Sequence, residues 1–241
     1  MSLIEAIRRA QVFDASPLIW NGTPLFPGHP PIEIDSRART HDRDGYFLQT
    51  LSLGEHTGSH ADAPAHALSG PSRQTIDAIP VDRFVAPYLV YDLSGLGLGP
   101  GDLATAADLR EAERATGHAL EPADAALIHF GWERHYLVEG GRWWAANAPG
   151  LAADACAYLV DRGAGLVGSD TATCDTAVRD GMIVSDVGHQ IYFLPNGIPI
   201  VEGLVGLSTV PPRGIFVGAP LKVSGGSGAP LRALLIVERD A

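Results

Sequence analysis

The most informative stretch of this chain is residues 56–66, which reads HTGSHADAPAH from His56 to His66. It holds three histidines and an aspartate among small residues. Imidazole and carboxylate ligands together suit zinc, manganese, iron or nickel, whereas sites made only of oxygen ligands suit magnesium or calcium. The stretch therefore predicts a transition-metal site. The alternative, three surface histidines in a flexible polar loop, explains one histidine better than three.

The spacing of these ligands limits the shape of the backbone. A straight strand would separate His56 and His60 by about 13 Å at ~3.3 Å per residue, too far for one ion. A regular helix would turn Asp62 away from both histidines and would end early at Pro64. Because Gly58 can take a positive φ and Pro64 fixes the exit, we expect an irregular, partly buried loop. In this loop His56, His60 and Asp62 converge.

The rest of the chain predicts an α/β or α+β protein. Periodic apolar residues predict helices over 105–117 and 151–162, and each ends at a glycine, Gly117 or Gly163. A strand-like run follows each helix, which favours two helix-to-strand units with parallel pairing. Residues 11–100 are expected to be mostly β. The strand-like runs are 46–53, 88–93, 125–130 and 165–168, with IPIVEGL, GIFVGAPLKV and LRALLIV after residue 198.

Composition and charge exclude several classes of protein. With 241 residues, 46% apolar and 19% charged, the chain is expected to form one globular domain, residues 1–241, rather than a disordered or fibrous protein. Its 17 basic residues against 28 acidic ones give a net charge of −11, which disfavours nucleic acid as a partner. No apolar run predicts a membrane span or signal peptide. Cys156 and Cys174 are too few for a disulfide framework, so a cytoplasmic protein is expected.

The stretch 56–66 resembles the His-x-Gly-Thr-His-x-Asp-x-Pro-x-His signature of the cyclase family of metal-dependent hydrolases. Only Ser59 departs from it, and serine keeps the hydroxyl of the family's threonine. The resemblance implies the family's α/β fold, a swivelling β/β/α domain with a mixed sheet, in a homodimer or larger assembly such as a tetramer. Further similar segments are 79–94, 127–132, 168–171, 219–222 and 226–230.

The resemblance also implies a set of metal ligands. His56, His60 and Asp62 bind a first ion, and Asp62 bridges to a second ion that His189 and Glu202 complete. One or two divalent ions, Zn²⁺ or Mn²⁺, are expected. From the residues alone, Glu202 lies in the apolar run IPIVEGLVGL, where a buried carboxylate needs a cation. An edge position facing water stays open as its alternative.

His66 is implied by the resemblance to be the catalytic acid and base. Imidazole suits this role because it titrates near neutral pH. The alternative is a residue that only orients a ligand. Candidate substrate-binding aromatics are Trp20, Phe26, Phe47 and Trp132, although such residues more often belong to a core. The remaining histidines are expected in the core (His129) or at the surface (His29, His41, His118 and His135).

The implied reaction is hydrolysis of a carbon–nitrogen amide bond in a small aromatic or cyclic molecule, such as an aryl formamide or the lactam isatin. The metal activates water for attack on the carbonyl, and His66 protonates the departing group. Three alternatives stay open: hydrolysis of a lactone, a cyclase or dehydratase reaction without hydrolysis, and metal binding without catalysis.

Overall fold

A mixed β-sheet forms the centre of the computed structural model, which describes residues 2–70, 73–136 and 141–239. Its strands are β1 (Ala10–Asp14), β4 (His60–Asp62), β5 (Val85–Asp92), β7 (Ala125–His129), β9 (Leu166–Ser169), β12 (Ile200–Glu202), β13 (Arg213–Val217), β14 (Gly228–Pro230) and β15 (Leu234–Glu238). They lie in the order β1-β15-β13-β5-β7-β9-β12-β4-β14. The four strands from β5 to β12 run parallel, and the flanking strands pair antiparallel.

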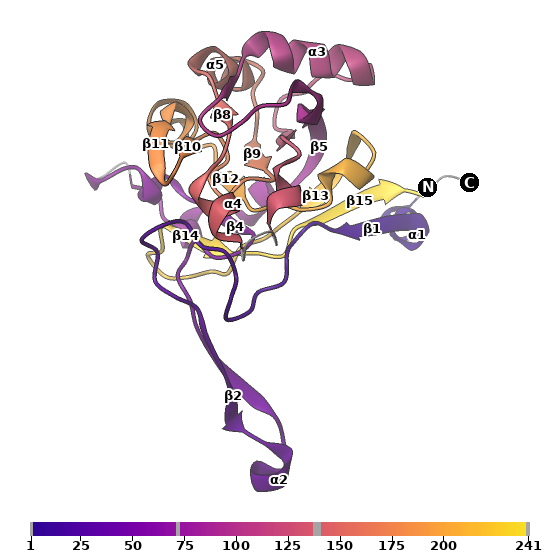
Figure 1. Cartoon of the computed structure of the whole chain (residues 1–241). Helices are drawn as coiled ribbons and strands as arrows, with labels where there is room; N and C mark the ends of the chain where they lie inside the picture. The colour runs from indigo at the N-terminus through magenta and orange to yellow at the C-terminus, as the bar shows by residue number, and fades with distance from the viewer. Residues whose placement is uncertain (1, 71–72, 137–140, 240–241) are drawn as a thin grey trace.

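Each face of the sheet carries its own apolar core. Successive side chains of a strand point to opposite faces, so Tyr88 and Val90 of β5 enter one core, and Leu89 and Tyr91 enter the other. The second core is covered by α3 (Ala106–Thr116) and α5 (Ala153–Asp161), which lie side by side at the top of Figure 1. The other helices are α1 (Leu3–Arg9), α2 (His41–Asp44) and α4 (Arg142–Ala146).

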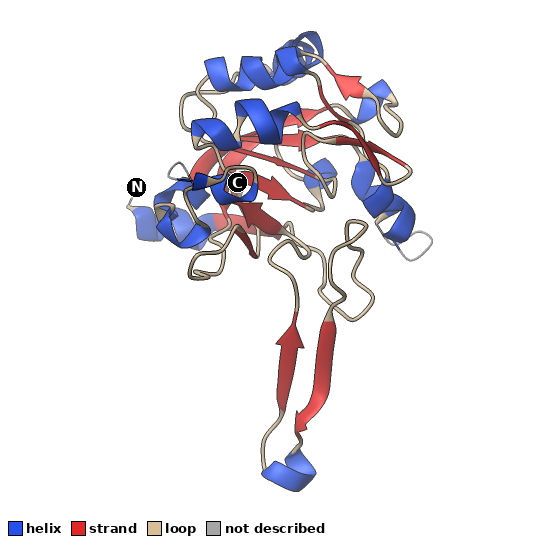
Figure 2. Ribbon diagram, turned by 90° about the vertical axis from the view of Figure 1, so that its left-hand side faces the viewer, coloured by secondary structure: helices blue, strands red, loops and turns tan. Residues whose placement is uncertain are grey.

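A long β-hairpin projects from this body (Figures 1 and 2). Strands β2 (Glu33–Arg39) and β3 (Leu48–Ser52) pair antiparallel, and α2 closes the tip. We call residues 33–52 the arm. Two smaller pairs lie in the body: β6 (Leu103–Ala104) with β8 (Gly150–Leu151), and β10 (Ala177–Arg179) with β11 (Met182–Ser185).

Short helical turns join many of these elements and carry part of the site. They are η1 (Pro64–His66), η3 (Ile76–Ala78), η4 (Val81–Phe84), η5 (Ser94–Leu96), η6 (Trp132–His135), η8 (Gly188–Tyr192), η9 (Leu194–Asn196) and η10 (Leu207–Thr209). The turn η8 is a π-helix.

The α/β architecture predicted from the sequence is confirmed. Helices α3 and α5 lie where periodicity predicts them, and Gly117 and Gly163 take positive φ angles of 70° and 78°. Strands β7 and β9 follow them and pair in parallel. The prediction that residues 11–100 are mostly β is only partly correct, because turns occupy much of this region and β3 belongs to the arm. Among the described residues, no helix is long and apolar enough to cross a membrane.

Candidate metal centre

The pairing of β4 with β12 brings together two residues far apart in the sequence. His60 lies directly opposite Glu202 in this antiparallel pair, so their side chains share one face of the sheet. The Nε2 atom of His60 is 3.2 Å from Oε2 of Glu202. Glu202 is only 5% exposed, and β12 lies between β9 and β4. The alternative in which Glu202 faces water from a sheet edge is therefore excluded.

The bend before β4 brings His56 close to His60 and Asp62. Residues 53–59 are irregular, and Gly58 takes a φ of +61°, as its position in the sequence predicts. His56 Nδ1 then lies 2.6 Å from Asp62 Oδ1, and His60 Nε2 lies 3.5 Å from the same oxygen. Beyond this bend the segment is a strand and not the irregular loop expected from the sequence, because residues His60–Asp62 hydrogen-bond to both β12 and β14.

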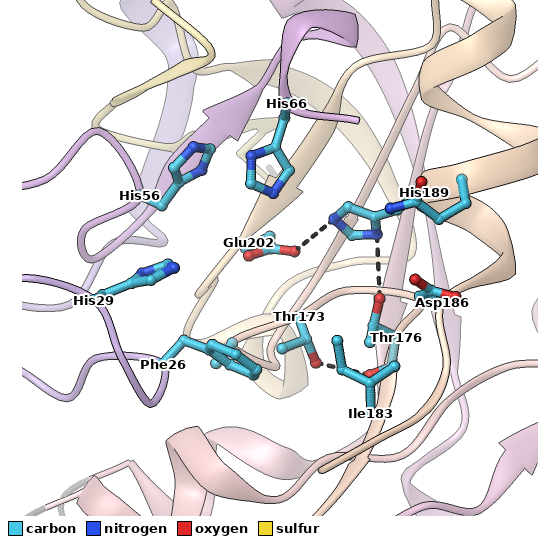
Figure 3. Close-up of a pocket in the computed structure, with 12 residues that line it drawn as sticks. Phe26, His29, His56, His66, Thr173, Thr176, Ile183, Asp186, His189 and Glu202 are labelled. Atoms are coloured by element: carbon cyan, nitrogen blue, oxygen red, sulfur yellow. Dashed lines mark hydrogen bonds and ion pairs between the residues drawn. The ribbon is translucent and has the colours of Figure 1, made fainter. Parts of the chain in front are cut away.

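His189 approaches from the opposite side, on η8. Its Nε2 atom is 3.4 Å from Asp62 Oδ2 and 3.3 Å from Glu202 Oε1. Figure 3 shows the imidazole of His189 pointing at Glu202 across the pocket from His56. Asp62 thus faces His56 and His60 through one oxygen and His189 through the other.

Two buried polar atoms in this cluster test whether its residues fit a cation. Within the described residues, His60 Nε2 and Asp62 Oδ2 have no hydrogen-bond partner. Buried polar groups are normally paired, and leaving them unpaired is energetically costly. Ligand atoms of His60, Asp62 and Glu202 lie within 4.8 Å of one another, as do those of His56, Asp62 and His66. This donor set of nitrogen and carboxylate oxygen fits a divalent transition metal.

The carboxylates of the cluster stay ionised. Burial alone would raise the pKa of Asp62, but the close imidazoles of His189 and His56 hold it well below its ordinary value. The pKa of Glu202 is also lowered, because His189 and His60 outweigh burial and the repulsion of Asp62. Against the opposing effect of burial, the two carboxylates raise the pKa of His60 to about 9. Without a metal, protonated imidazole balances the negative charge of the two carboxylates. A metal ion can supply that positive charge instead.

Two of the imidazoles are oriented by groups on their far side. The Nδ1–H of His60 donates to the carbonyl of Gly58 at 2.9 Å. His56 Nε2 lies 3.0 Å from the hydroxyl of Ser227, which donates to Glu55 at 2.6 Å. Each ring thereby turns its other nitrogen toward Asp62, the arrangement that metal-binding histidines need.

His66 lies at the cavity wall beside these residues. Its ring centroid is 4.2 Å from that of His56 and 5.9 Å from that of His189. The reduced solvation of its ring lowers the pKa of His66 below its ordinary value, although Asp62 opposes this shift. This shift favours the neutral imidazole, which can accept a proton.

The cluster opens into a cavity of about 140 Å³. Phe26 and Ile183 provide apolar wall, and Thr173, Thr176 and Asp186 provide polar groups (Figure 3).

Only one of the four aromatics proposed from the sequence, Phe26, lines this cavity. Trp20 and Phe47 are 45% and 53% exposed and lie outside it, and Phe47 belongs to the arm. Trp132 is buried in the core under α3 and α5, and its indole donates to the carbonyl of Asn147. Its position at a strand end in the sequence gives no indication of this burial.

His29 is exposed, as its polar sequence context predicts, and it also lines the cavity, which the sequence did not indicate. Its ring centroid is 5.7 Å from Phe26 and 6.0 Å from His56. The only local signal is the turn at Gly28, whose φ is +93°. The pocket residues Thr173, Thr176, Asp186 and Gln190 were also missed, because nothing in their local sequence indicates a cavity. His129 is buried beside Asp92, as predicted.

Comparisons with known proteins agree over most of the chain. Residues 12–176 match the Cyclase family, described as "Putative cyclase". An isatin hydrolase from Roseibium aggregatum is 28% identical over 95% of this chain and 92% of its own length. A kynurenine formamidase from Salinibacter ruber is 32% identical over 95% of this chain and 98% of its own. The solved structure of an isatin hydrolase bound to the product analogue thioisatinate has a TM-score of 0.85 and 25% identity, covering 99% of this chain and 100% of that one.

Proposed function

Because the chain belongs to the cyclase family of metal-dependent hydrolases, we propose that it hydrolyses the amide bond of a small aromatic or cyclic substrate. The substrate class is an aryl formamide or a lactam such as isatin. One observation carries the proposal: His60 Nε2 and Asp62 Oδ2, which have no hydrogen-bond partner in the described part of the chain, are buried together beside a cavity that His66 lines. His66 supports catalysis, because a site that only binds metal does not require an acid–base group at its cavity.

Two ions fit the proposed ligand set. His56, His60 and Asp62 hold the first, and Asp62, His189 and Glu202 hold the second. The support is the two-sided position of Asp62, whose oxygens face different histidines. Zn²⁺ or Mn²⁺ suits these ligands. A divalent ion in such a site lowers the pKa of bound water and polarises a substrate carbonyl.

His66 is the proposed acid and base. Its neutral ring, at the wall of the cavity, can accept a proton from the attacking water and deliver it to the departing nitrogen. The alternative role, orientation of His56, is also compatible with the 4.2 Å between their ring centroids. The two roles differ in whether loss of the imidazole also loosens the metal.

The cavity supports a planar substrate. Phe26 offers an aromatic surface close to His29, and Ile183 closes the wall on β11. An aromatic ring placed there gains apolar contact while its carbonyl reaches the ligand cluster.

The test is turnover of isatin, formanilide and dihydrocoumarin by protein stripped of metal and then reloaded with Zn²⁺ or Mn²⁺. We expect cleavage of the lactam or the formamide, lost on chelation and restored by the ion. In water labelled with ¹⁸O, the product acid should gain one labelled oxygen. Turnover of the lactone alone would overturn the amide specificity. An unlabelled product would indicate a cyclase or dehydratase reaction instead.

We also propose that the chain forms a homodimer through the arm. Phe47 is 53% and Leu51 62% exposed, and Tyr46 and Leu48 are exposed beside them. An isolated two-stranded hairpin is only marginally stable in water, so an arm that extends from the body and exposes these apolar side chains needs a partner surface (Figure 2). Light scattering should give the mass of a dimer or tetramer, and Phe47→Ser with Leu51→Ser should give a monomer. A monomeric wild-type protein would contradict this proposal.

We further infer that residues 1–241 form one domain that works in the cytoplasm. Both cores share the central sheet. Cys156 and Cys174 are buried and unpaired, as in proteins of reducing compartments.

A further inference from the structure

A buried carboxylate outside the proposed ligand set holds His189. Asp175 Oδ1 is 2.6 Å from Nδ1 of the imidazole. Its other oxygen, Oδ2, accepts the backbone N–H of Gly188 at 2.8 Å and that of His189 at 3.2 Å. Asp175 has no exposed surface and is not among the residues that line the cavity. Its side chain is therefore committed to the first turn of η8 and to the ring on that turn.

The backbone is shaped to accept this carboxylate. A Cβ atom at position 188 would lie 2.3 Å from Cγ of Asp175, so the close approach requires glycine. The carbonyl of Asp175 accepts the N–H of Leu151 at 2.8 Å, and a Cβ at position 150 would lie 2.2 Å from that carbonyl oxygen. Two glycines on separate elements thus leave room for Asp175.

The three proposed ligand histidines differ in what orients them. His60 donates to a backbone carbonyl and His56 contacts a hydroxyl, whereas His189 contacts a carboxylate. A carboxylate on the far nitrogen fixes the tautomer and makes the imidazole a stronger metal ligand. Of the three, His189 alone has this support.

We propose that Asp175 is a positioning residue for the second metal ion. It keeps the proton of His189 on Nδ1 and turns the lone pair of Nε2 toward Asp62 and Glu202, which lie 3.4 Å and 3.3 Å away. This inference rests on the proposed function, since it concerns how the chain holds the second ion. Thr176 also contacts Nδ1, but its hydroxyl is uncharged and lies 3.3 Å away. Its contribution is smaller.

The test is calorimetric titration of the metal-free proteins with Zn²⁺ and Mn²⁺. Asp175→Asn keeps the size of the side chain and removes its charge, and we expect the second Kd to rise about tenfold to hundredfold while the first is unchanged. Thr176→Val should change the second Kd much less. Asp170→Asn, which removes a buried carboxylate away from these ligands, should leave both Kd values unchanged.

Equal second-site affinity in Asp175→Asn and wild type would overturn the inference. Loss of both ions in a folded variant, judged by circular dichroism, would overturn it too, because the role would then be general support of the site. If Asp175→Asn does not fold, ¹⁵N NMR of the loaded wild-type protein decides: we expect the proton of His189 on Nδ1, and a proton on Nε2 contradicts the proposal. A wild-type protein that binds no ion would instead defeat the proposed function.

Discussion

Two buried carboxylates, Asp170 and Asp62, have opposite surroundings. Asp170, just after β9, accepts backbone N–H groups of Phe130 at 2.9 Å and of Trp132 at 2.6 Å. Asp62, at the end of β4, faces three imidazoles, and its Oδ2 atom has no hydrogen-bond partner within the described ranges. Burial alone therefore does not distinguish a structural carboxylate from a ligand. The distinction is whether backbone donors already satisfy both oxygens.

The pKa values of Asp170 and Asp62 are shifted in opposite directions. Burial raises the pKa of Asp170 to about 6, which His129 and the backbone donors only partly oppose. The histidines instead hold the pKa of Asp62 well below its ordinary value. Asp62 thus remains an anion that can bind a metal, whereas Asp170 anchors the turn after β7.

The largest effect is expected from His60→Ala. This change removes a ligand with two carboxylate neighbours and leaves them repelling each other. Metal content should fall to background, and turnover should fall by more than about 10⁴-fold, beyond the range of acid–base assistance. Elemental analysis and kcat/KM check both values. Retention of both ions would remove His60 from the ligand set.

Loss of His66 should have a smaller and different effect. In His66→Ala we expect turnover to fall by about 10²- to 10⁴-fold with both ions still bound, because the imidazole moves a proton without being a required ligand. The measurement pairs kcat with metal content on one preparation. A variant that loses the metal as well would show that His66 supports a ligand instead.

Removal of the metal should lower the free energy of unfolding only in proteins whose Asp62 cluster still binds the ion. Free ion at 100 times its Kd stabilises the folded state by about 2.7 kcal/mol, which is roughly 5–10 °C in Tm for a chain of this size. Chelation should produce this drop in wild type and in Asp170→Asn. In His60→Ala, chelation should leave the Tm unchanged, and an equal drop there would place the stabilising ion elsewhere.

The smallest effect is the pH dependence of Asp170. Its pKa is raised on folding, so the folded state binds the extra proton, and the resulting stability is present below about pH 3.8 and lost as the pH rises to about 6. The stability of wild type relative to Asp170→Asn should therefore decrease across this window and then stay constant. Urea denaturation at pH 4, 5, 6 and 7 measures the difference. An increase with pH would mean that Asp170 is stabilised as an anion.

The sequence predicts those features of the Asp62 region that depend on neighbouring residues. Gly58 and Pro64 indicate the bend that gathers His56, His60 and Asp62, because all the constraints lie within a few residues. The helix-to-strand units are predictable for the same reason.

Long-range features are not predictable from local patterns. The opposition of His60 and Glu202 depends on the pairing of β4 with β12, and the strand order of the sheet has no local signal. His29 reaches the cavity, and Trp132 enters the core, through tertiary packing. The roles of Asp170 and Asp175 likewise depend on contacts with other elements.

We propose above all that the buried polar atoms around Asp62 bind divalent metal. The most direct measurement is elemental analysis of wild-type protein purified without chelator and, separately, reconstituted, beside His60→Ala and Asp170→Asn prepared in the same way. We expect close to two Zn²⁺ or Mn²⁺ ions per chain in wild type and Asp170→Asn, and almost none in His60→Ala. No bound ion in reconstituted wild type, or the same metal content in all three proteins, would contradict this proposal.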